Sequence, residues 1–404
     1  MSRACVRAAM FALAAGLLII AAGAQAAGYR YDSCTVDTDS DRIMDCYETD
    51  TGIYVGPTDT GTDPLNPDTD DDGIDDGDEV FGTTAGLNLP FYGVSPVHKD
   101  ILLQYDWMED ATGCVAHSHK PTEGAVALVG EVFDKAPVSN PDGVDGIHVF
   151  QDIHYGLASN INYSSHLIPD ADGIINGNIH FPAGGDWDDY EAAYFPAKRH
   201  GYFHYVIFAH EYTDVPGSSG SATIPGYEMI VSMGCYWYAP DWKVASAIVH
   251  ELGHNLSLRH GGNTNCNYKP NYNSIMNYQY SFSGLASCAL APHEGSIGYS
   301  RGLRRPLDES NLYEPDGVCT VGTVPIDWNR NGVIDTTPFA RVLTPPNVGC
   351  PSGYPTLYDY DDYANLFLGG IHSASVEVQV CAPATLGCPG RSACGAWIWI
   401  SGSP

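Results

Sequence analysis

Three histidines and one glutamate lie close together in residues 250–260, which read HELGHNLSLRH. On a helix, His250 and His254 would lie one turn apart on the same face, so both imidazoles could bind one metal ion. Glu251 would lie beside them and could orient a water molecule on that ion. The spacing therefore predicts a zinc site with hydrolytic chemistry. The alternative is a buried helix whose histidines are satisfied by ordinary hydrogen bonds.

His260 can join this site only if the helix ends before it. A continuous helix would place His260 about 15 Å along the axis from His250, whereas the ligands of one zinc ion lie within roughly 4 Å of each other. Asn255 and Ser257 are poor helix formers, and two glycines follow His260. We therefore expect the chain to leave the helix after Leu256 and to turn back.

The stretch resembles the signature of the metzincin zinc proteases, H-E-x-x-H-x-x-G-x-x-H followed by a Met-turn. His250, His254 and His260 match the zinc ligands, and Glu251 matches the general base and acid. Ser257 is a departure, because the family has glycine at that position. A serine in a left-handed conformation there would cost on the order of 1 kcal/mol.

Met276 and Tyr278, in the segment SIMNY, match the second half of the signature. The resemblance implies that Met276 is an apolar floor beneath the three histidines, a role close to ordinary core packing. It also implies that Tyr278 is a fifth ligand or a donor to the transition state. An ordinary structural tyrosine is the alternative for Tyr278.

Other segments, including HKDILLQYDWMED, HSHKP and NPDGVDGI, are similar to those of bacterial secreted metzincins that carry calcium repeats. His117 and His119 in HSHKP could form a second metal site. Alternating histidines on a loop are more often solvated, so no metal site is predicted there.

Two acidic segments, residues 37–48 and 68–79, share one spacing of carboxylates. A hard cation such as Ca²⁺ takes about six to eight oxygens, and a twelve-residue loop with alternating carboxylates can wrap one. Gly73 would supply the sharp turn at the sixth position of the second loop, whereas the first loop has Arg42 there. A disordered acidic tail is the alternative. The predicted calcium ligands are Asp37, Asp39, Asp41, Asp45 and Glu48 in the first loop, and Asp68, Asp70, Asp72, Asp76 and Glu79 in the second.

A third segment, DWNRNGVIDTTP at 327–338, repeats the same frame in part. Its candidate ligands are Asp327, Asn329, Asn331 and Asp335. Its last position is a proline, which cannot ligate through its side chain, so it is a partial calcium loop. Together with GTDPLNPDTDDDGIDDGDEV, the first two loops resemble thrombospondin type 3 calcium repeats.

The organisation of the chain predicts an α/β protein. Strands are expected at 100–108, 146–153, 202–210 and 227–237, and helices at 121–137 and 241–256, with Asp241 as the cap of the second. Resemblance to metzincins implies a catalytic domain over 98–370, with a twisted mixed sheet, an active-site helix and a loop-rich C-terminal subdomain. A small calcium-loop module over 27–97 would precede it. A tail over 371–404 gives no clear signal.

Residues 1–26 have the basic start, apolar run and Ala24-Gln25-Ala26 exit of a secretory signal peptide, so a secreted, extracellular protein is expected. An uncleaved membrane anchor is the alternative. Of the 12 cysteines, only Cys5 lies in that segment, and an exported chain usually oxidises the rest. Cys34 could pair with Cys46, while Cys266 with Cys288 and Cys319 with Cys350 would close later loops, although the sequence leaves the pairing open.

The formal net charge of −31 would repel nucleic acids and anionic membranes. These features predict a secreted, monomeric zinc endopeptidase that is stabilised by calcium and acts on proteins or peptides. A non-enzymatic, calcium-dependent adhesion or matrix-binding protein with a structural zinc site is the alternative. Hydrolysis of a non-peptide amide would use the same zinc chemistry.

Overall fold

The computed structural model describes residues 34–110, 116–153, 164–170, 172–234, 239–369 and 378–381, the last range by its backbone alone. The predicted signal peptide and most of the predicted tail lie outside these residues. The chain divides into two compact units, residues 1–35 and residues 36–404, and the fold described below belongs to the second.

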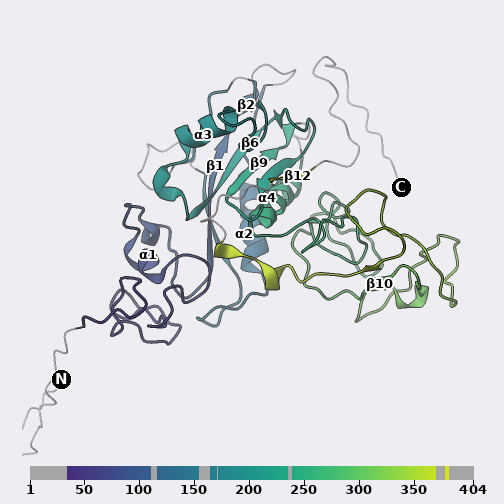
Figure 1. The fold of residues 1–404 in the computed structure, drawn as a ribbon, viewed down its shortest axis with the longest axis horizontal. Coiled ribbons are helices and arrows are strands. Elements are labelled where there is room, and N and C mark those ends of the chain that lie inside the picture. The colour runs from purple at the N-terminus through teal and green to yellow at the C-terminus, as the bar shows by residue number, and fades with distance from the viewer. Residues whose placement is uncertain are drawn as a thin grey trace, which may run out of the picture. The chain divides into compact units, whose positions relative to one another are not determined.

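Twelve strands and four α-helices lie in the described residues (Figure 1). The helices are α1 (Asp76–Phe81), α2 (Glu123–Asp134), α3 (Asp186–Tyr194) and α4 (Asp241–Asn255). The strands are β1 (Asp100–Trp107), β2 (Glu109–Asp110), β3 (His117–Ser118), β4 (His148–Asp152), β5 (Ile174–Ile175), β6 (Phe203–Ala209), β7 (Glu211–Tyr212), β8 (Gly220–Thr223), β9 (Glu228–Ser232), β10 (Leu307–Asp308), β11 (Thr356–Leu357) and β12 (Val378–Cys381).

Six of the strands form one mixed sheet in the order β12-β8-β9-β6-β1-β4. Strand β1 pairs in parallel with β4 and β6, and β6 pairs in parallel with β9. Strand β8 runs antiparallel to β9, and β12 runs antiparallel to β8. All residues of β1 and β6 are buried, as expected for parallel strands covered on both faces. The predicted α/β class is confirmed.

Helices cover both faces of this sheet (Figure 1). Helices α2 and α4 pack against one face, where Phe133 and Leu252 share a buried cluster with Leu103 of β1. On the other face, Trp187 of α3 shares a second cluster with Leu102 of β1. The sheet and α4 therefore form one rigid support for the residues that α4 carries.

The two predicted helices are present, with small differences at their starts. Thr122 caps α2 by accepting a hydrogen bond from the N–H of Ala125 at 3.1 Å. The predicted cap of α4 was Asp241, but Pro240 holds the cap position and Asp241 is the first helical residue. The Asp241 carboxylate instead accepts the hydroxyl of Thr122 at 2.7 Å, which ties the starts of the two helices together.

The acidic segments before residue 98 share a core with the sheet. Ile74, Leu87 and Leu89 lie in the same buried cluster as Leu102 of β1. These residues therefore belong to the same compact unit as the sheet. None of the described helices has the length and apolar character that crossing a membrane requires.

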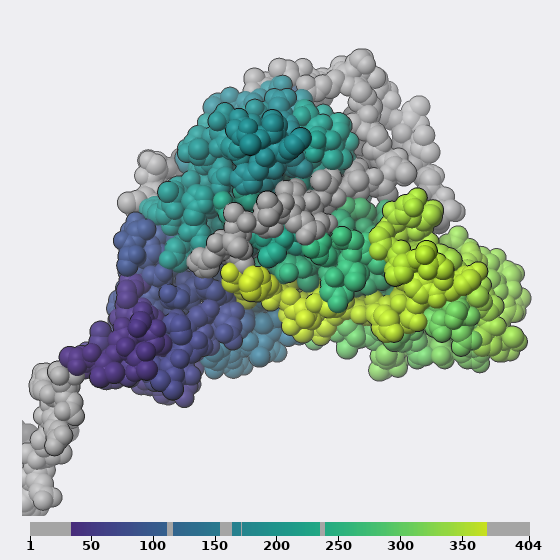
Figure 2. Space-filling view, in the orientation of Figure 1, coloured from purple at the N-terminus to yellow at the C-terminus, as the bar shows by residue number. Residues whose placement is uncertain are grey.

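The residues after α4 are rich in loops, and Figure 2 shows them as a broad green-to-yellow surface. Two disulfides join Cys266 to Cys350 and Cys288 to Cys319. The pairing that sequence distance suggested for these four cysteines is therefore wrong. A small buried cluster that includes Leu307 and Leu312 packs the loops of this region together. Packing, rather than separation along the chain, therefore sets which cysteines form disulfides. Cys34 and Cys46 are also disulfide-bonded.

Candidate metal centres

Three histidine rings converge at the end of α4. The ring centroids of His250 and His254 are 4.9 Å apart, as one helical turn requires. The ring of His260, which follows the helix, lies 5.4 Å from that of His250 and 4.8 Å from that of His254. One nitrogen of each residue lies within 4.8 Å of the others. Three imidazoles in this arrangement fit the ligand set of a zinc ion with one open position.

A sharp bend at Ser257 brings His260 back to the helix. Ser257 has a left-handed φ of 77°. Its N–H donates to the carbonyl of His254 at 2.9 Å, and the N–H of Leu258 donates to the carbonyl of Gly253 at 2.8 Å. These bonds satisfy carbonyls that the end of the helix would otherwise leave without partners. The bend lies where the sequence predicts it, immediately after Leu256.

Backbone carbonyls fix the rings of the two helical histidines. Nδ1 of His250 donates to the carbonyl of Ile275 at 2.7 Å, and Nδ1 of His254 donates to the carbonyl of Leu258 at 2.7 Å. A carbonyl can only accept, so Nδ1 carries the proton in both rings and Nε2 keeps its lone pair. This is the tautomer and the outer hydrogen bond that a metal-binding histidine needs.

Burial keeps these imidazoles uncharged at neutral pH. Desolvation lowers the pKa of His250 to about 4 and that of His260 to about 3. Desolvation, followed by the charges of His260 and His250, lowers the pKa of His254 well below its usual range. Metal ligation requires neutral imidazole, so the surroundings already select the ligating form.

Met276 packs against α4 between the two helical histidines. A Cβ placed on Gly253 would lie only 2.4 Å from the sulfur of Met276. The Met276 side chain is fully buried. It therefore fills the space beside the histidines, and only a glycine at position 253 leaves room for it.

Tyr278 lies beside the ring cluster. Its ring centroid is 4.5 Å from that of His260 and 5.8 Å from that of His250. The N–H of Tyr278 donates to the side-chain oxygen of Asn267 at 2.9 Å, which fixes the backbone at this point. The aromatic ring is thus placed where its hydroxyl could serve the same site.

Glu251 projects from α4 toward strand β8. Its side chain is completely buried. A Cβ placed on Gly220 would lie 2.2 Å from Oε1 of Glu251, so this carboxylate packs directly on the backbone of β8. The predicted base therefore lies between the histidine helix and an antiparallel strand of the sheet.

The two predicted calcium loops fold in the same way. In the second loop, Asp68 accepts the N–H groups of Asp72 and Gly73, at 3.2 and 2.8 Å. Asp72 in turn accepts the N–H of Ile74 at 2.8 Å. The first loop has a similar pattern: Asp37 accepts the N–H groups of Ser40 and Arg42, at the fourth rather than the fifth position and at the sixth, and Asp41 accepts the N–H of Ile43.

The aspartates at the ninth position brace both loops. Asp45 accepts the N–H and the hydroxyl of Thr38, at 2.8 and 2.7 Å. Asp76 accepts the same two groups of Thr69, at 2.9 and 2.6 Å. The shared register of the two sequences is therefore also a shared geometry.

Arg42 adopts the left-handed conformation that the sixth loop position requires, with a φ of 87°, close to the 93° of Gly73. Its guanidinium forms an ion pair with Asp78 and donates to the carbonyl of Gly82 at 3.1 Å. These contacts offset the strain of a non-glycine residue, which is of order 1–2 kcal/mol.

Carboxylates gather where the two loops meet. Asp37, Asp39 and Asp41 converge within 4.8 Å, and so do Asp41, Glu48 and Asp76. Asp76, predicted as a ligand of the second loop, thus also faces the first. These two groups contain five of the ten predicted calcium ligands.

Burial and mutual repulsion hold these carboxyl groups partly protonated when no cation is bound. Desolvation, followed by the charges of neighbouring aspartates, raises the pKa of Asp70 to about 8 and that of Glu48 to about 7. Desolvation raises the pKa of Asp76 to about 8 and that of Asp72 and Glu79 well above the usual range. A divalent cation would relieve this repulsion.

Asp100 was not among the predicted calcium ligands, although it adjoins the second loop. Asp100, the first residue of β1, donates its N–H to the Asp72 carboxylate at 2.7 Å. Its charge is also among the causes that raise the pKa of Asp72. An aspartate at the start of a predicted strand was the only available signal.

The third loop keeps the same backbone pattern. Asp327 accepts the N–H groups of Asn331 and Gly332, at 3.1 and 2.7 Å. Glu314, from outside the loop, accepts the N–H groups of Asn329 and Asp335, at 3.2 and 2.6 Å. A buried glutamate therefore braces the loop from outside, whereas its own last position holds Pro338.

His117 and His119, for which no metal site was predicted, lie together with His210. The ring centroids of the first two are 4.6 Å apart, and one nitrogen of each of the three lies within 4.8 Å of the others. His210 follows β6, so its approach depends on the pairing of β6 with β1.

A search of protein families, curated proteins and solved structures finds no match to this chain.

Proposed function

We propose that this chain is a secreted, zinc-dependent endopeptidase. The observation that supports it most strongly is the convergence of His250, His254 and His260 beside the buried carboxylate of Glu251. A structural zinc site needs no such carboxylate, which favours hydrolysis over the adhesion alternative. The resemblance of this segment to the metzincin signature supports the same reaction class.

Zinc bound to the three histidines would leave one position for water, would lower the pKa of that water and would polarise the scissile carbonyl. Glu251 would accept the proton of the attacking water and return it to the leaving amine. Its packing against β8 limits the positions its carboxylate can take, which supports its role as the proton acceptor. The hydroxyl of Tyr278 would donate to the developing oxyanion.

The peptide substrate would lie extended along β8. Gly220 of this strand touches Glu251, so a peptide that pairs with β8 would pass the catalytic carboxylate. Extended peptides commonly bind by adding a strand to a sheet edge. In the structure this edge of β8 pairs with β12, with Cys381 opposite Gly220. A substrate would therefore have to displace β12.

Calcium bound in the first two loops would stabilise the fold. The raised pKa values of Asp70 and Asp76 reflect burial and repulsion between neighbouring carboxylates, and a bound cation would offset that repulsion. The contact between Asp72 and Asp100 links the second loop to β1, a central strand of the sheet. Calcium binding to the folded state would thus raise its free energy of unfolding.

Casein cleavage by the mature protein and by Glu251→Gln would test the proposal. Glutamine keeps the shape of the side chain but cannot accept the proton, so kcat should fall by roughly 10²–10⁴-fold. Zinc content should stay unchanged. Glu131→Gln, on the exposed surface of α2, is the matched control and should keep full activity.

Two other outcomes would redirect the assignment. If the wild-type protein binds zinc but cleaves neither casein nor gelatin, the adhesion alternative gains support. If it cleaves small amides while proteins remain intact, the hypothesis that it hydrolyses non-peptide amides is favoured. Equal casein cleavage by the wild type and by Glu251→Gln would overturn the assigned mechanism.

A further inference from the structure

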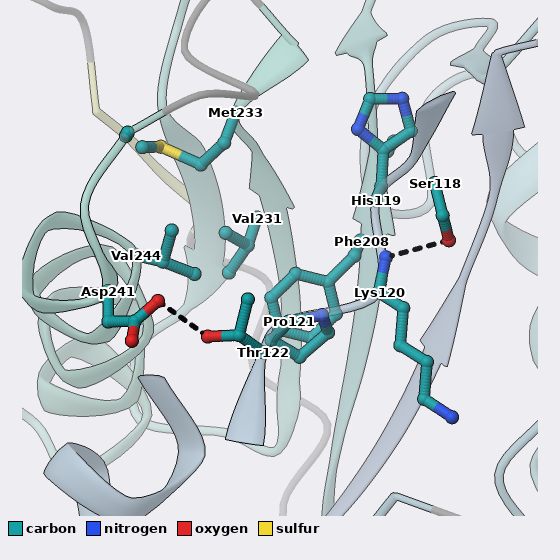
Figure 3. A pocket seen from close by; sticks show the side chains of 12 residues that line it. Ser118, His119, Lys120, Pro121, Thr122, Phe208, Val231, Met233, Asp241 and Val244 are labelled. Carbon is teal, nitrogen blue, oxygen red and sulfur yellow. Dashed lines mark hydrogen bonds between the residues drawn. The ribbon is translucent and has the colours of Figure 1, made fainter. Parts of the chain in front are cut away.

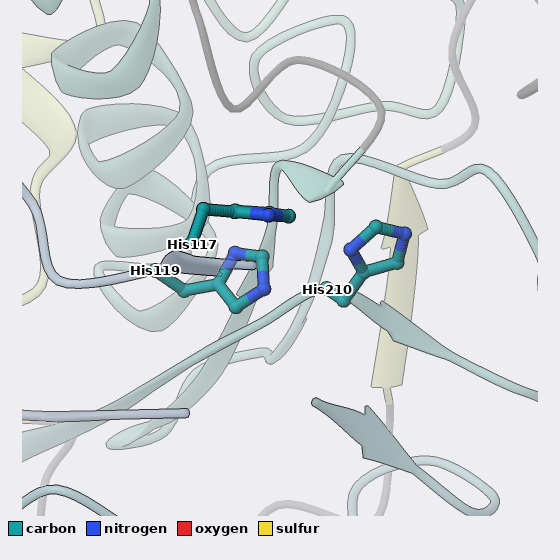
Figure 4. Close-up of side chains that lie close together, drawn as sticks. All are labelled: His117, His119 and His210. Carbon is teal, nitrogen blue, oxygen red and sulfur yellow. The ribbon is translucent and has the colours of Figure 1, made fainter. Parts of the chain in front are cut away.

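A second group of three histidines lies away from α4. His117, His119 and His210 each direct their rings into one space (Figure 4). Their ring centroids are separated by 4.6 Å, 5.4 Å and 5.6 Å, and one nitrogen of each lies within 4.8 Å of the others. These separations match those of the histidines at the end of α4.

Backbone hydrogen bonds hold His119 and His210 in place, and His117 pairs with Asp110 in the β2–β3 hairpin. The N–H of His119, which follows β3, donates to the carbonyl of Met108 at 3.0 Å. The N–H of His210 donates to the carbonyl of Gly173 at 2.7 Å, and its carbonyl accepts the N–H of Gly234 at 3.0 Å. The rings therefore extend from a fixed frame.

Two glycines leave space for the rings. A Cβ on Gly173 would lie 3.2 Å from Cβ of His210 and 3.4 Å from Nε2 of His119. A Cβ on Gly234 would lie 2.4 Å from Cγ of His210. Larger residues at either position would crowd the rings, so the backbone approaches the cluster closely only because both positions are glycine.

A buried carboxylate lies behind His210. Oδ2 of Asp110 is 3.5 Å from Nδ1 of His210, and Asp110 is almost fully buried. Metal-binding histidines commonly direct their second nitrogen toward a carboxylate, which fixes the ring and strengthens the ligand. A separation of 3.5 Å is at the limit of a hydrogen bond, so Asp110 contributes mainly its negative charge beside the three rings, and that charge favours a bound cation.

The contact between His210 and Asp110 is longer than the ion pairs that another histidine of this chain forms. Nδ1 and Nε2 of His180 contact Asp188 and Glu228 at 2.6 and 2.5 Å. The hydrogen bond that His180 donates to Glu228 is the largest cause that raises the pKa of His180, to about 9, so that ring is a cation. At the second cluster, by contrast, imidazoles face one another.

We propose that His117, His119 and His210 bind a second divalent transition-metal ion of the zinc class. Imidazole ligands suit such ions, whereas calcium would demand oxygen ligands. The ion would join the β2–β3 hairpin to the turn after β6. It would thus fasten together segments that are about 90 positions apart in the sequence.

The second ion would lie well away from the first. His119 lines a small pocket together with Asp241 and Val244 at the start of α4 (Figure 3). His250 lies nine positions after Asp241, or roughly 14 Å along the helix axis. Paired catalytic metal ions lie only about 3.5–4 Å apart, so the two sites would act separately.

Zinc content of the full mature chain tests this proposal without using activity. After dialysis against a zinc buffer with calcium present, the wild type should hold two zinc ions per chain by mass spectrometry. His210→Gln and His254→Gln should each hold one, and the double variant none. His200→Gln, on an exposed histidine outside both clusters, is the matched control and should hold two.

A spectroscopic titration protects the test against misfolding. His254→Gln with native circular dichroism should still bind one Co²⁺ ion with visible absorption, and adding His119→Gln should abolish that signal. The proposal is overturned if the wild type holds one zinc ion that His254→Gln loses and His210→Gln keeps. Loss of protease activity alone would change neither count, so the two proposals fail separately.

Discussion

The rings of His250 and His260 lie nearly parallel, with planes 28° apart and centroids 5.4 Å apart, although ten positions separate the residues. A continuous helix would hold them about 15 Å apart along its axis. The left-handed residue Ser257 creates the difference, because it ends α4 and reverses the chain. The geometry of the proposed zinc site therefore depends on one backbone conformation.

Ser257→Gly should stabilise the protein. Glycine adopts a φ of 77° without the steric cost that serine carries, so the free energy of unfolding should rise by up to about 1 kcal/mol. Denaturant unfolding at fixed zinc and calcium would measure this change.

Two further substitutions, Ser257→Val and Ser283→Gly, are controls for that prediction. Ser257→Val should destabilise the bend and weaken zinc binding, because a β-branched residue disfavours a left-handed conformation. Ser283, which does not have a positive φ, should lose stability when it is replaced by glycine. An unchanged or lower stability of Ser257→Gly would show that the bend carries no strain.

Much of the sheet could be predicted from hydrophobic runs. Strands β1, β4, β6 and β9 all lie within predicted segments. Strands β1, β6 and β9 are fully buried, as is typical of strands covered on both faces, which read as hydrophobic runs. Helix α4 was predicted from the stripe formed by Ala245, Ile248, Leu252 and Leu256, all of which are buried.

Strand β8 could not be predicted, because its residues Gly220–Thr223 read as a glycine- and serine-rich turn. The structure explains its composition: Glu251 packs against Gly220, where a larger residue would overlap the carboxylate. Small residues are thus required by a tertiary contact that local propensity does not reveal.

The second histidine cluster shows the same limit at longer range. His117 and His119 form an unremarkable local pattern, and His210 lies at the end of a separate predicted strand. Only the parallel pairing of β1 with β6 brings the ends of these strands to one edge of the sheet. The available signal was that His210 ends one predicted strand and that His117 and His119 follow another.

Tyr278→Phe should lower kcat with little change in KM. The ring of Tyr278 lies 4.5 Å from that of His260, and in the proposed mechanism its hydroxyl donates to the oxyanion that develops in the transition state. Loss of one such donor costs roughly 10²-fold in kcat. Steady-state kinetics on a peptide substrate would measure it.

Tyr268→Phe is the matched control for this substitution. The ring of Tyr268 packs 5.9 Å from that of Tyr278, so the variant tests general disturbance of the loop. It should keep kcat near the wild-type value. Equal losses in both variants would argue that Tyr278 acts only through packing.

Removal of calcium should reverse the pH dependence of stability. The pKa values of Asp70 and Asp76 are raised to about 8, and that of Glu48 to about 7, so without calcium the folded state binds more protons than the unfolded state. The contribution of these carboxyl groups to the free energy of unfolding should then fall as the pH rises from about 4 to 8. With calcium bound, the carboxylates are ionised in the folded state, and stability should rise with pH.

Denaturant unfolding in excess EGTA and in excess calcium, each at several pH values, would check this prediction. Zinc should be kept constant by a separate buffer. A stabilisation by calcium, relative to EGTA, that does not grow from pH 5 to pH 8 would contradict the raised pKa values of these carboxyl groups. Curves that coincide in EGTA and calcium would show that the loops bind no calcium.

Truncation before β12 should lower KM for peptide substrates. Residues Val378–Cys381 pair with Thr223–Gly220, the same edge of β8 that the proposed substrate would use. A chain that ends at residue 377 would leave this edge open, so a peptide could bind without displacing β12. A chain that ends at residue 381 keeps the strand and is the matched control, since it lacks only residues 382–404. If both truncated chains show the KM of the full-length protein, substrate and β12 do not compete for β8, and the peptide must approach Glu251 from another direction.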